Sequence, residues 1–444
     1  MLIDSLPLST LRQKIETRKA LVGVIGLGYV GLPFAVEKVK AGFTVVGIEQ
    51  NAARATRVNL ADNYIADVKD HELKMAVESG QFRATTDFDE ISHLDVIVIC
   101  VPTPLTKNLT PNLEYVESVT RSIAHHLKPG QLISLESTTY PGTTDEVMRP
   151  ILEATSGLQV GQDFFLAHSP ERVDPGNQRY TTKNTNKVVG ASDPDSRLIA
   201  TLFYQQTIEQ VVPVSSAKAA ELVKVFENTF RAVNIALVNE LALLCDRMDL
   251  NVWEVLDAAN TKPFGIMPFY PGPGVGGHCI PIDPHYLEWK AKELNFNTHF
   301  IALAGEINRK MPEFVREKVW RLLNQVGVVP AQSRVMVMGV AYKKNLGDWR
   351  ESPAIEIMHL LQKDGITLTY HDPYVAEVQV GDQVLLSVEL TESAVTSADM
   401  VLITTDHTGI DYGTLVQQAK AVLDTRGVTR HLDLAHLVDK ITLL

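Results

Sequence analysis

Residues 21–31 read LVGVIGLGYVG, a short apolar run that leads into the spacing Gly-x-Gly-x-x-Gly. The apolar run at 21–25 predicts a buried strand, and the pattern after the glycines predicts a helix that ends near Ala41. Residues 44–49, TVVGIE, predict the next strand. A glycine-rich turn between a strand and a helix, with a second strand after it, is typical of a dinucleotide-binding βαβ unit.

The residue types in this unit indicate which dinucleotide it binds. Gly26, Gly28 and Gly31 permit a tight turn and the close approach of a pyrophosphate. The helix N-terminus that follows, with Tyr29 and Val30, offers amide donors and the positive end of the helix dipole.

Glu49 lies 18 residues after Gly31, at the tip of the second strand. A carboxylate there accepts hydrogen bonds from the adenosine ribose and repels a 2′-phosphate, so we expect NAD rather than NADP. Arg54 is a possible phosphate partner in the same site. The alternative for Glu49 is a solvated charge at a strand end.

The remainder of the chain predicts two α/β domains around a helical one. Further apolar strands are expected at 96–101, 132–136 and 164–168, with a long helix at 216–248 and another helix at 313–326. Residues 335–342 and 399–405 then resemble 22–29 and 95–101, without the complete glycine spacing. We therefore expect an α/β protein in which two Rossmann-like doubly wound domains are joined by a central helical domain with a long spine helix. The expected divisions are an N-terminal extension at 1–19, an NAD-binding domain at 20–212, the helical domain at 213–328 and a substrate-binding domain at 329–444.

Polar residues follow two of the expected strands. Thr103 follows the strand at 96–101, and Thr138 follows the strand at 132–136. Ligands of open α/β sheets bind outside the carboxyl ends of the strands, so both threonines are candidates to contact the nicotinamide half of NAD. Each could instead be a helix N-cap.

Composition excludes several classes of function. The net charge of −12 disfavours nonspecific binding of nucleic acid, and an anionic substrate needs a local cluster of Lys and Arg. Three cysteines cannot form a disulfide framework, which favours a reducing, cytoplasmic compartment. No apolar run approaches the roughly 20 residues of a membrane helix, and residues 1–18 do not resemble a signal peptide.

One cysteine lies in an unusual loop, GPGVGGHCIPIDP at 272–284. Cys100 and Cys245 lie in apolar segments and are expected to pack as small core residues. The glycines and prolines around Cys279 instead deny it a regular apolar element, which favours a covalent role. We expect no metal site, because no second cysteine stands within a few residues of Cys279 to form a zinc-type pair.

Further polar groups remain, and together with the motifs above they resemble a known family. Lys224, Asn228 and Arg231 are spaced four and three residues apart, hence on one helical face. From about residue 20 to the C-terminus, the chain resembles the UDP-glucose/GDP-mannose dehydrogenase family. The motifs that carry the resemblance are GLGYVGLP (26–33), CVPTP (100–104), AELVKVFEN (220–228), GGHCIPIDP (276–284) and RESP (350–353). Within the family, ESTTYPGTT (136–144), SPERVDPGN (169–177), TKPFG (261–265) and YPGPGVGGHCIPIDPHYL (270–287) are most similar to bacterial UDP-N-acetylglucosamine 6-dehydrogenases.

The resemblance implies a four-electron oxidation of the C6 alcohol of a UDP-sugar to a carboxylate, with two NAD molecules used in succession, for bacterial surface polysaccharide synthesis. Cys279 is expected to carry the C6 carbon as a thiohemiacetal and then as a thioester. Lys224 and Asn228 are expected to stabilise oxyanion charge. Asp283 is expected to act with a water as general base. Glu171, accompanied by Thr138, is expected to position the substrate and to assist thioester hydrolysis.

The resemblance also assigns binding residues. The residues expected to contact the UDP-sugar are Glu171, Arg172, Val173, Lys224, Asn228, Arg231, Tyr270, Gly276, Tyr342, Lys343 and Arg426. Arg350 is expected to contact the ligands as well, as a cofactor-binding residue and as part of the positive charge that the UDP group needs.

Alternatives remain open at this point. Ile282 stands where UDP-glucose enzymes carry a lysine, which disfavours UDP-glucose. The expected sugar is N-acetylglucosamine, with N-acetylmannosamine and N-acetylgalactosamine behind it. Two other functions compete with this one. The first is a two-electron β-hydroxyacid dehydrogenase, which would have no use for Cys279. The second is a catalytically silent nucleotide-sugar sensor, which need not retain a nucleophile. We expect a homodimer or a larger homo-oligomer. The long helix at 216–248 could form the contact between copies, although a helix buried within one chain would have the same sequence pattern.

Overall fold

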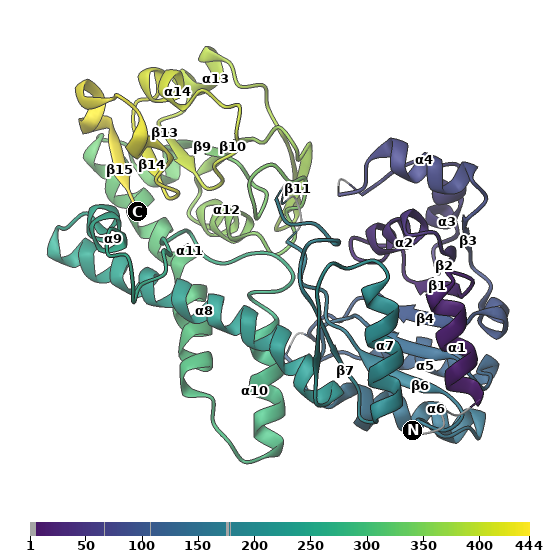
Figure 1. The fold of residues 1–444 in the computed structure, drawn as a ribbon. Coiled ribbons are helices and arrows are strands. Elements are labelled where there is room, and N and C mark those ends of the chain that lie inside the picture. The colour runs from purple at the N-terminus through teal and green to yellow at the C-terminus, as the bar shows by residue number, and fades with distance from the viewer. Residues whose placement is uncertain (1–5, 66, 107, 175–176, 178) are drawn as a thin grey trace. The chain divides into compact units, whose positions relative to one another are not determined.

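The computed structural model describes residues 6–65, 67–106, 108–174, 177 and 179–444. The chain divides into two compact units (Figure 1). The first comprises residues 1–227 and 289–296, and the second comprises residues 228–288 and 297–444. The division into an N-terminal extension and three domains, predicted from the sequence, stays a prediction. Pro175 and Gly176, in the SPERVDPGN motif, and the first five residues of the predicted N-terminal extension lie outside the described residues.

The first unit is built on an eight-stranded sheet in the order β3-β2-β1-β4-β5-β6-β7-β8. Its first six strands run parallel, in the order expected of a dinucleotide-binding fold. Their bounds are β1 Leu21–Ile25, β2 Thr44–Ile48, β3 Phe82–Thr85, β4 Val96–Ile99, β5 Leu132–Leu135 and β6 Phe165–His168. β7 (Lys187–Gly190) then runs antiparallel to β6, and β8 (Val211–Val214) runs parallel to β7.

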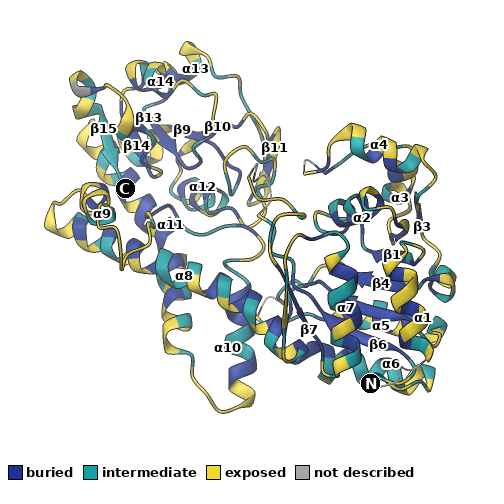
Figure 2. Ribbon diagram, in the orientation of Figure 1, coloured by how far each residue is buried: buried dark blue, intermediate teal, exposed yellow. Residues whose placement is uncertain are grey.

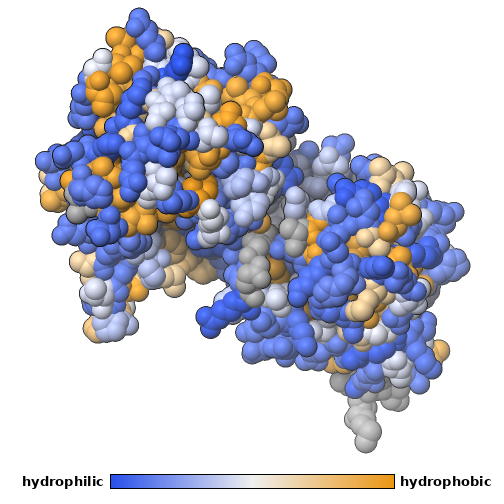
Figure 3. Space-filling model, turned by 90° about the horizontal axis from the view of Figure 1, so that it is seen from above, coloured by the Kyte–Doolittle hydropathy of each residue, from blue (hydrophilic) through white to orange (hydrophobic). Residues whose placement is uncertain are grey.

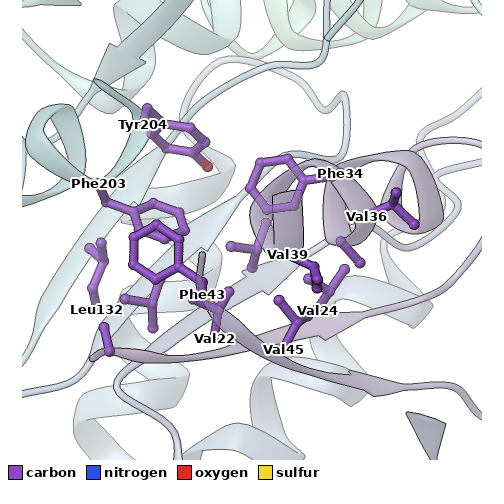
Figure 4. Packing of buried hydrophobic residues seen from close by; sticks show 14 of the residues in the cluster. Val22, Val24, Phe34, Val36, Val39, Phe43, Val45, Leu132, Phe203 and Tyr204 are labelled. Atoms are coloured by element: carbon purple, nitrogen blue, oxygen red, sulfur yellow. The ribbon is translucent and has the colours of Figure 1, made fainter. Parts of the chain in front are cut away.

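Alternate residues of these strands fill two separate cores, as a pleated strand requires. On β4, Val96 and Val98 belong to one core, and Ile97 and Ile99 belong to the other. Figure 2 shows β4 and β6 fully buried between helices whose outer faces are exposed. In the first core, Phe34 of α2 (Gly31–Lys40) packs near Phe203 and Tyr204 of α7 (Pro194–Gln205), as Figure 4 shows.

Helices cover both faces of this sheet. The helices that contribute to the first core are α1 (Leu6–Glu16), α2 (Gly31–Lys40), α3 (Ala52–Asn59), α4 (Asp70–Glu78) and α7 (Pro194–Gln205). The second core lies under α5 (Glu114–His126) and α6 (Arg149–Ser156), with the short helical turns η1 (Phe88–His93) and η2 (Thr143–Met148). α1 lies within the N-terminal extension that was predicted at 1–19, ahead of the first strand.

Long helices begin the second unit. α8 (Ala217–Met248) agrees closely with the helix predicted at 216–248, and Asn228 marks the point where it enters this unit. It is followed by α9 (Val252–Asn260), α10 (Asp283–Glu293) and α11 (His299–Gln325), and α10 runs back into the first unit at Trp289. The sequence predicted the last of these helices only from Glu313. The helix instead begins at His299 and continues through Pro312.

A second parallel sheet completes the second unit, in the order β10-β9-β13-β14-β15. Its strands are β9 (Arg334–Met338), β10 (Thr367–His371), β13 (Met400–Ile403), β14 (Val422–Asp424) and β15 (Ile441–Leu443). Val335 and Val337 face a core with α11 and α12 (Pro353–Lys363), whereas Met336 and Met338 face α13 (Glu392–Ser397) and α14 (Tyr412–Gln418). The hairpin β11 (Glu377–Val380) and β12 (Gln383–Leu386) and the turns η3 (Pro330–Gln332), η4 (Val428–His431) and η5 (Ala435–Lys440) lie between these elements. The predicted fold class is confirmed.

On the face drawn in Figure 3, hydrophobic side chains form patches between hydrophilic ones. Of the helices within the described residues, none is long and apolar enough to cross a membrane.

Candidate functional site

The turn between β1 and α2 shows why each of its three glycines is needed. Gly26 has a φ of +89°, and a Cβ there would lie 2.5 Å from the carbonyl oxygen of Cys100. A Cβ on Gly31 would lie 1.9 Å from the carbonyl oxygen of Gly26, so the helix can approach the strand only without a side chain. A Cβ on Gly28 would meet nothing within 4 Å. The turn is therefore closed beneath Gly26 and Gly31 and open over Gly28, as a pyrophosphate cradle requires.

Glu49 closes the adenosine side of this turn. It directly follows β2, is buried, and accepts hydrogen bonds from the backbone amides of Leu27 and Asn51, both at 3.0 Å. Its carboxylate also pairs with Arg54 of α3 at 3.2 Å. Because Arg54 is engaged by the acid, the site presents a carboxylate rather than a free guanidinium to the ribose. The residues present therefore fit NAD.

The other predicted cofactor contacts surround the same sheet edge. Tyr29 is exposed and Val30 is half-buried at the N-terminus of α2. The hydroxyl of Thr103 donates to the carbonyl of Thr138 at 2.7 Å, which joins the segments after β4 and β5. The structure thus brings these two threonines together at the carboxyl end of the sheet.

Glu171 is held by its own loop. One carboxylate oxygen accepts the amides of Arg172 and Val173 at 2.8 and 2.7 Å, and the other accepts Lys187 at 3.0 Å. Burial acts to raise the pKa of Glu171, but Lys187 and the Val173 amide outweigh it and hold the pKa below its usual range. Glu171 is therefore a hydrogen-bond acceptor here and not a proton donor.

Arg172, predicted to bind substrate, is engaged within the first unit. Its guanidinium pairs with Glu227 of α8 at 2.5 Å and donates to the carbonyl of Asn186 at 2.7 Å. These contacts tie the loop after β6 to the spine helix. A direct contact of Arg172 with substrate stays a prediction.

A buried ion network behind Glu171 was missed by the sequence analysis. Lys187 pairs with Glu136 at 2.8 Å as well as with Glu171, and Glu136 accepts a hydrogen bond from Tyr204 at 2.9 Å. Burial raises the pKa of Glu136 against the opposing effect of Lys187. Burial acts to lower the pKa of Lys187, but its two carboxylate partners together outweigh burial, and the pKa of Lys187 is raised. A lysine at the start of an otherwise apolar strand, KVVG, is the signal that could have revealed this network.

The helical face predicted from spacing lies on α8, and all three of its residues are at least partly buried. Lys224 belongs to the first unit and has an electrostatic effect on Glu171. In the second unit, the Arg231 guanidinium donates to the side-chain oxygen of Asn228, and the Asn228 amide donates to Asp283. Asn228 and Asp283 are buried. Two of the predicted polar residues of α8, Asn228 and Arg231, are thus connected to Asp283, the first residue of α10.

The cysteine loop is fastened at its end to this chain. Cys279 is exposed, and its carbonyl oxygen accepts the amide of Asp283 at 2.8 Å, so the cysteine lies one turn before α10. At its beginning, the loop is held by the Gly272 amide, which donates to Asn239 of α8 at 3.0 Å. The thiol is therefore carried on a segment anchored at both ends. Cys100, by contrast, has its pKa raised by burial, in keeping with a packing role.

Within the second unit, the loop glycines pack against the RESP motif. A Cβ on Gly276 would lie 2.8 Å from both Tyr342 and Pro353, and one on Gly277 would lie 2.9 Å from the Tyr342 ring. Any side chain would push the loop away from these groups. Gly276 and Tyr342, both predicted substrate contacts, are thereby brought together, and Lys343 follows Tyr342 directly.

Arg350 lies beside the same loop. Its guanidinium forms two hydrogen bonds to Asp348, at 2.9 and 2.7 Å, and Asp348 lies 3.8 Å from His278. Burial lowers the pKa of His278, and Arg350 lowers it further. Arg350 belongs to the second unit, so its predicted contact with the cofactor stays a prediction.

Tyr270 and Arg426 flank the loop. The Tyr270 ring stacks on Trp253, with centroids 5.6 Å apart, and its hydroxyl donates to Asp257 at 2.8 Å. Arg430 pairs with the same Asp257 at 2.5 Å. Arg426 lies against Gly272, where an added Cβ would lie 3.0 Å from its guanidinium. These contacts fix Tyr270 and place Arg426 at the start of the loop.

The predicted residues therefore divide between the units. The first unit holds Gly26, Gly28, Tyr29, Val30, Gly31, Glu49, Arg54, Thr103, Thr138, Glu171, Arg172, Val173 and Lys224, and the second holds Asn228, Arg231, Tyr270, Gly276, Cys279, Asp283, Tyr342, Lys343, Arg350 and Arg426. No cluster of three or more His, Cys, Asp or Glu side chains in the described part of the chain is arranged to hold a metal ion.

The strand order, the glycine turn and the acid after β2 define a dinucleotide-binding domain of the NAD-dependent oxidoreductase class. Models of three domains of one family match almost the whole chain: the NAD binding domain at residues 20–208, the central domain at 218–310 and the UDP binding domain at 336–431. The chain belongs to the UDP-glucose/GDP-mannose dehydrogenase family.

Relatives with different sugars are about equally similar. The UDP-N-acetyl-D-mannosamine dehydrogenase of Pyrococcus horikoshii is 35% identical over 387 residues, which cover 87% of this chain and 89% of that protein. The UDP-N-acetyl-D-glucosamine 6-dehydrogenase of Pseudomonas aeruginosa is 36% identical over 356 residues, 80% of this chain and 83% of that protein. A solved structure of UDP-D-ManNAc dehydrogenase from P. horikoshii superposes with a TM-score of 0.85 at 31% identity, covering 94% of this chain and 97% of that one.

Proposed function

We propose that this protein oxidises the C6 alcohol of a UDP-N-acetylhexosamine to a carboxylate, with two molecules of NAD consumed for each sugar. UDP-N-acetyl-D-glucosamine is the proposed substrate. The observation that carries the proposal is the hydrogen-bonded chain from Arg231 through Asn228 to Asp283, which holds a buried carboxylate four residues after an exposed cysteine on an anchored loop. A two-electron alcohol dehydrogenase needs no such nucleophile.

In the proposed reaction, NAD supplies the hydride acceptor for both oxidations. The Cys279 sulfur attacks the C6 aldehyde that the first oxidation forms, and the new C–S bond makes a thiohemiacetal. Loss of hydride from C6 converts it to a thioester. Water then adds to C6, the C–S bond breaks, and the uronate leaves while the thiol is restored.

Other residues of the chain have separate roles in these steps. Lys224 and Asn228 stabilise negative charge on the C6 oxygen, since they lie one turn apart on α8. Asp283 takes the proton of the attacking water. Glu171 acts as a hydrogen-bond acceptor that positions the sugar. Thr138, which follows the neighbouring strand β5, accompanies it. The lowered pKa of Glu171 supports this role over that of a general acid.

The choice of sugar rests on a small difference. Ile282 occupies the turn between Cys279 and Asp283, and its amide donates to the Cys279 carbonyl at 3.1 Å. An apolar residue there disfavours UDP-glucose, whose enzymes resemble this chain but carry a lysine at this position. UDP-N-acetylmannosamine is the second choice, because relatives named for the two N-acetylated sugars are 35% and 36% identical to this chain.

A panel of UDP-sugars, assayed for NADH release, tests the proposal directly. UDP-N-acetylglucosamine should give the highest kcat/KM and two NADH per sugar consumed. One NADH per sugar would identify a two-electron dehydrogenase. Binding of both ligands without any NADH would identify a sensor. A higher kcat/KM with UDP-N-acetylmannosamine would replace the proposed sugar and leave the reaction unchanged.

We also propose that the protein forms a homodimer through α8. Large apolar side chains line this helix at spacings of four and seven residues and are exposed: Leu222, Phe226, Phe230, Leu237, Leu244 and Met248. Phe226 and Leu237 each have more than 60% of their surface exposed, at 61% and 62%. An exposed apolar stripe of this kind fits a second copy of the same helix.

Light scattering of the purified protein tests this contact. The wild type should have twice the mass of one chain, and Leu237→Glu should shift it toward a monomer. Leu294→Glu is the matched control, because Leu294 is 74% exposed but lies outside α8. A wild-type protein that is monomeric at micromolar concentration contradicts the proposal.

A further inference from the structure

The ion network behind Glu171 contains two carboxylates and one ammonium group. Glu136 and Lys187 have side-chain exposures of 0% and 4%, and Glu171 has 16%. One ammonium group therefore serves two carboxylates inside the protein. Buried charges are costly unless they are paired, so this arrangement requires Lys187 at this point.

The reversal of one strand explains how Lys187 reaches the carboxyl edge of the sheet. His168, the last residue of β6, pairs with Gly190, the last residue of β7, in antiparallel register. Lys187, the first residue of β7, therefore lies beyond the end of β6, at the level of the Glu171 loop. Glu136 directly follows β5, the neighbour of β6, and reaches the same place.

Hydrogen bonds around Glu171 leave it little freedom. Its carboxylate accepts two amides from its own loop and one ammonium hydrogen from Lys187. The loop amides alone fix one oxygen, and Lys187 fixes the other. The position of the whole carboxylate therefore depends on a lysine that is itself held from behind by Glu136, which is held in turn by Tyr204.

We propose that Lys187 is a positioning residue for the oxidation: it holds the Glu171 carboxylate, and the backbone of residues 171–173 with it, in the orientation that receives the sugar. This inference rests on the proposed function. The alternative is an ion pair that serves stability alone. The positioning role requires that Lys187 act on catalysis through Glu171, whereas the stability role does not.

A double-mutant cycle separates them. Lys187→Met, Glu171→Gln and the double variant are compared with Lys183→Met, an exposed lysine on the same segment. Lys187→Met should lower kcat on the order of 10-fold to 100-fold, with the KM for NAD unchanged. In the Glu171→Gln background, Lys187→Met should lower kcat by less than about threefold, because the carboxylate that Lys187 positions is already altered. Equal losses in both backgrounds would overturn the proposal.

The pH profile gives a second readout. Lys187 and Lys224 lower the pKa of Glu171 against the effect of burial. Glu136 faces Lys187, and Tyr204, Cys100 and Lys38 interact with Glu136. Without Lys187, the acidic limb of kcat should move to higher pH, and Lys187→Arg should restore it. An acidic limb that stays in place in Lys187→Met contradicts the proposal.

Two further measurements keep the outcome interpretable. If Lys187→Met does not fold, Lys187→Met combined with Glu136→Gln removes one of the two carboxylates and provides a folded variant for the same cycle. NADH release by the wild type is measured first with the UDP-sugar panel, so a failure of the proposed function is seen before any variant is compared. If the wild type is active and the losses of kcat in the cycle are additive, the positioning role of Lys187 is refuted and the proposed function is not.

Discussion

Asn228 on α8 donates its side-chain amide to the carboxylate of Asp283 on α10, and both side chains are buried. The Asp283 amide in turn donates to the carbonyl of Cys279. One asparagine therefore connects the spine helix to the acid, and the backbone of that acid is bonded to the backbone of the cysteine. Loss of this amide affects both the stability of the loop and the proposed chemistry.

Asn228→Ala should lower the free energy of unfolding by about 1–3 kcal/mol, because it removes a hydrogen bond to a buried carboxylate. The kcat should fall by at least about tenfold, since both the proposed oxyanion donor and the partner of the base are lost. Urea unfolding and steady-state kinetics measure the two effects. Asn234→Ala is the control, because the Asn234 amide donates to the Phe230 carbonyl of its own helix. Equal effects of the two substitutions would contradict this role for Asn228.

Thiol reactivity should distinguish the three cysteines. Cys279 is exposed, Cys245 is buried, and burial raises the pKa of Cys100. A thiol reagent such as Ellman's reagent should therefore modify about one thiol per folded chain rapidly. Cys279→Ser should remove this fast phase.

The same variant tests the covalent steps. Cys279→Ser should retain UDP-sugar binding by calorimetry, and it should stall the second oxidation or the release of the acid. Full turnover by Cys279→Ser, with two NADH per sugar, would be incompatible with a thioester on this residue. A fast phase that persists in Cys279→Ser would show that another thiol is accessible.

The glycine turn predicts two opposite phenotypes for the same substitution. A methyl group on Gly31 would lie 1.9 Å from the Gly26 carbonyl oxygen, so Gly31→Ala should destabilise the protein by about 3 kcal/mol or more. A methyl group on Gly28 meets nothing within 4 Å, so Gly28→Ala should change stability by less than about 0.5 kcal/mol.

Gly28→Ala should instead weaken NAD by at least about tenfold, because its methyl group would fill space that the pyrophosphate needs. Thermal unfolding and NAD titration by intrinsic fluorescence separate the two phenotypes. If Gly28→Ala binds NAD as the wild type does, the open space over Gly28 is not the pyrophosphate site.

The pairing of Glu49 with Arg54 predicts the cofactor preference. Glu49→Gln removes the charge that engages Arg54 and keeps an acceptor for the Leu27 amide. The kcat/KM for NADP, relative to that for NAD, should rise by about tenfold or more, because Arg54 becomes available to a 2′-phosphate. Glu37→Gln is the control, since Glu37 pairs with Lys40 on the surface of α2. An unchanged ratio in Glu49→Gln would remove Glu49 from the selection of NAD.

Local patterns explain what the sequence could predict. The βαβ unit follows from glycine spacing and apolar alternation within about thirty residues, and the long helix follows from its period, so α8 is found within one residue of its predicted start. The same rules misplaced the start of α11. A proline usually marks a helix boundary, but Pro312 is buried inside this helix, where packing outweighs the lost hydrogen bond.

Long-range pairing explains what the sequence could not predict. Glu136 and Lys187 are 51 residues apart, and they meet only because β7 runs against β6. Neither a charge pattern nor a motif encodes that reversal. Cys279 could be singled out in advance from its glycine- and proline-rich loop, and the role of Asp283 was implied by the resemblance to the family. The partner of Asp283, Asn228, is 55 residues away, and the structure alone gives their contact.

A last prediction concerns His168, at the end of β6. Its side chain is fully buried, and neither ring nitrogen has a hydrogen-bond partner among the described residues. Burial and, to a smaller extent, the nearby Lys187 together lower the pKa of His168 to about 3. The folded protein therefore binds fewer protons than the unfolded chain between about pH 3 and the ordinary histidine pKa of 6.5. Stability should rise with pH through this window and fall as the pH drops through it.

The wild type should accordingly lose about 2 kcal/mol of unfolding free energy from this residue between pH 7 and pH 5. His168→Leu should make the stability curve shallower over the same range, because leucine fills the site without a titrating group or an unmet hydrogen bond. His93→Leu, at an exposed position in η1, is the control and should leave the slope unchanged. Urea unfolding at pH 5, 6 and 7 measures the slopes. Identical slopes for the wild type and His168→Leu would show that His168 is not the acid-sensitive group.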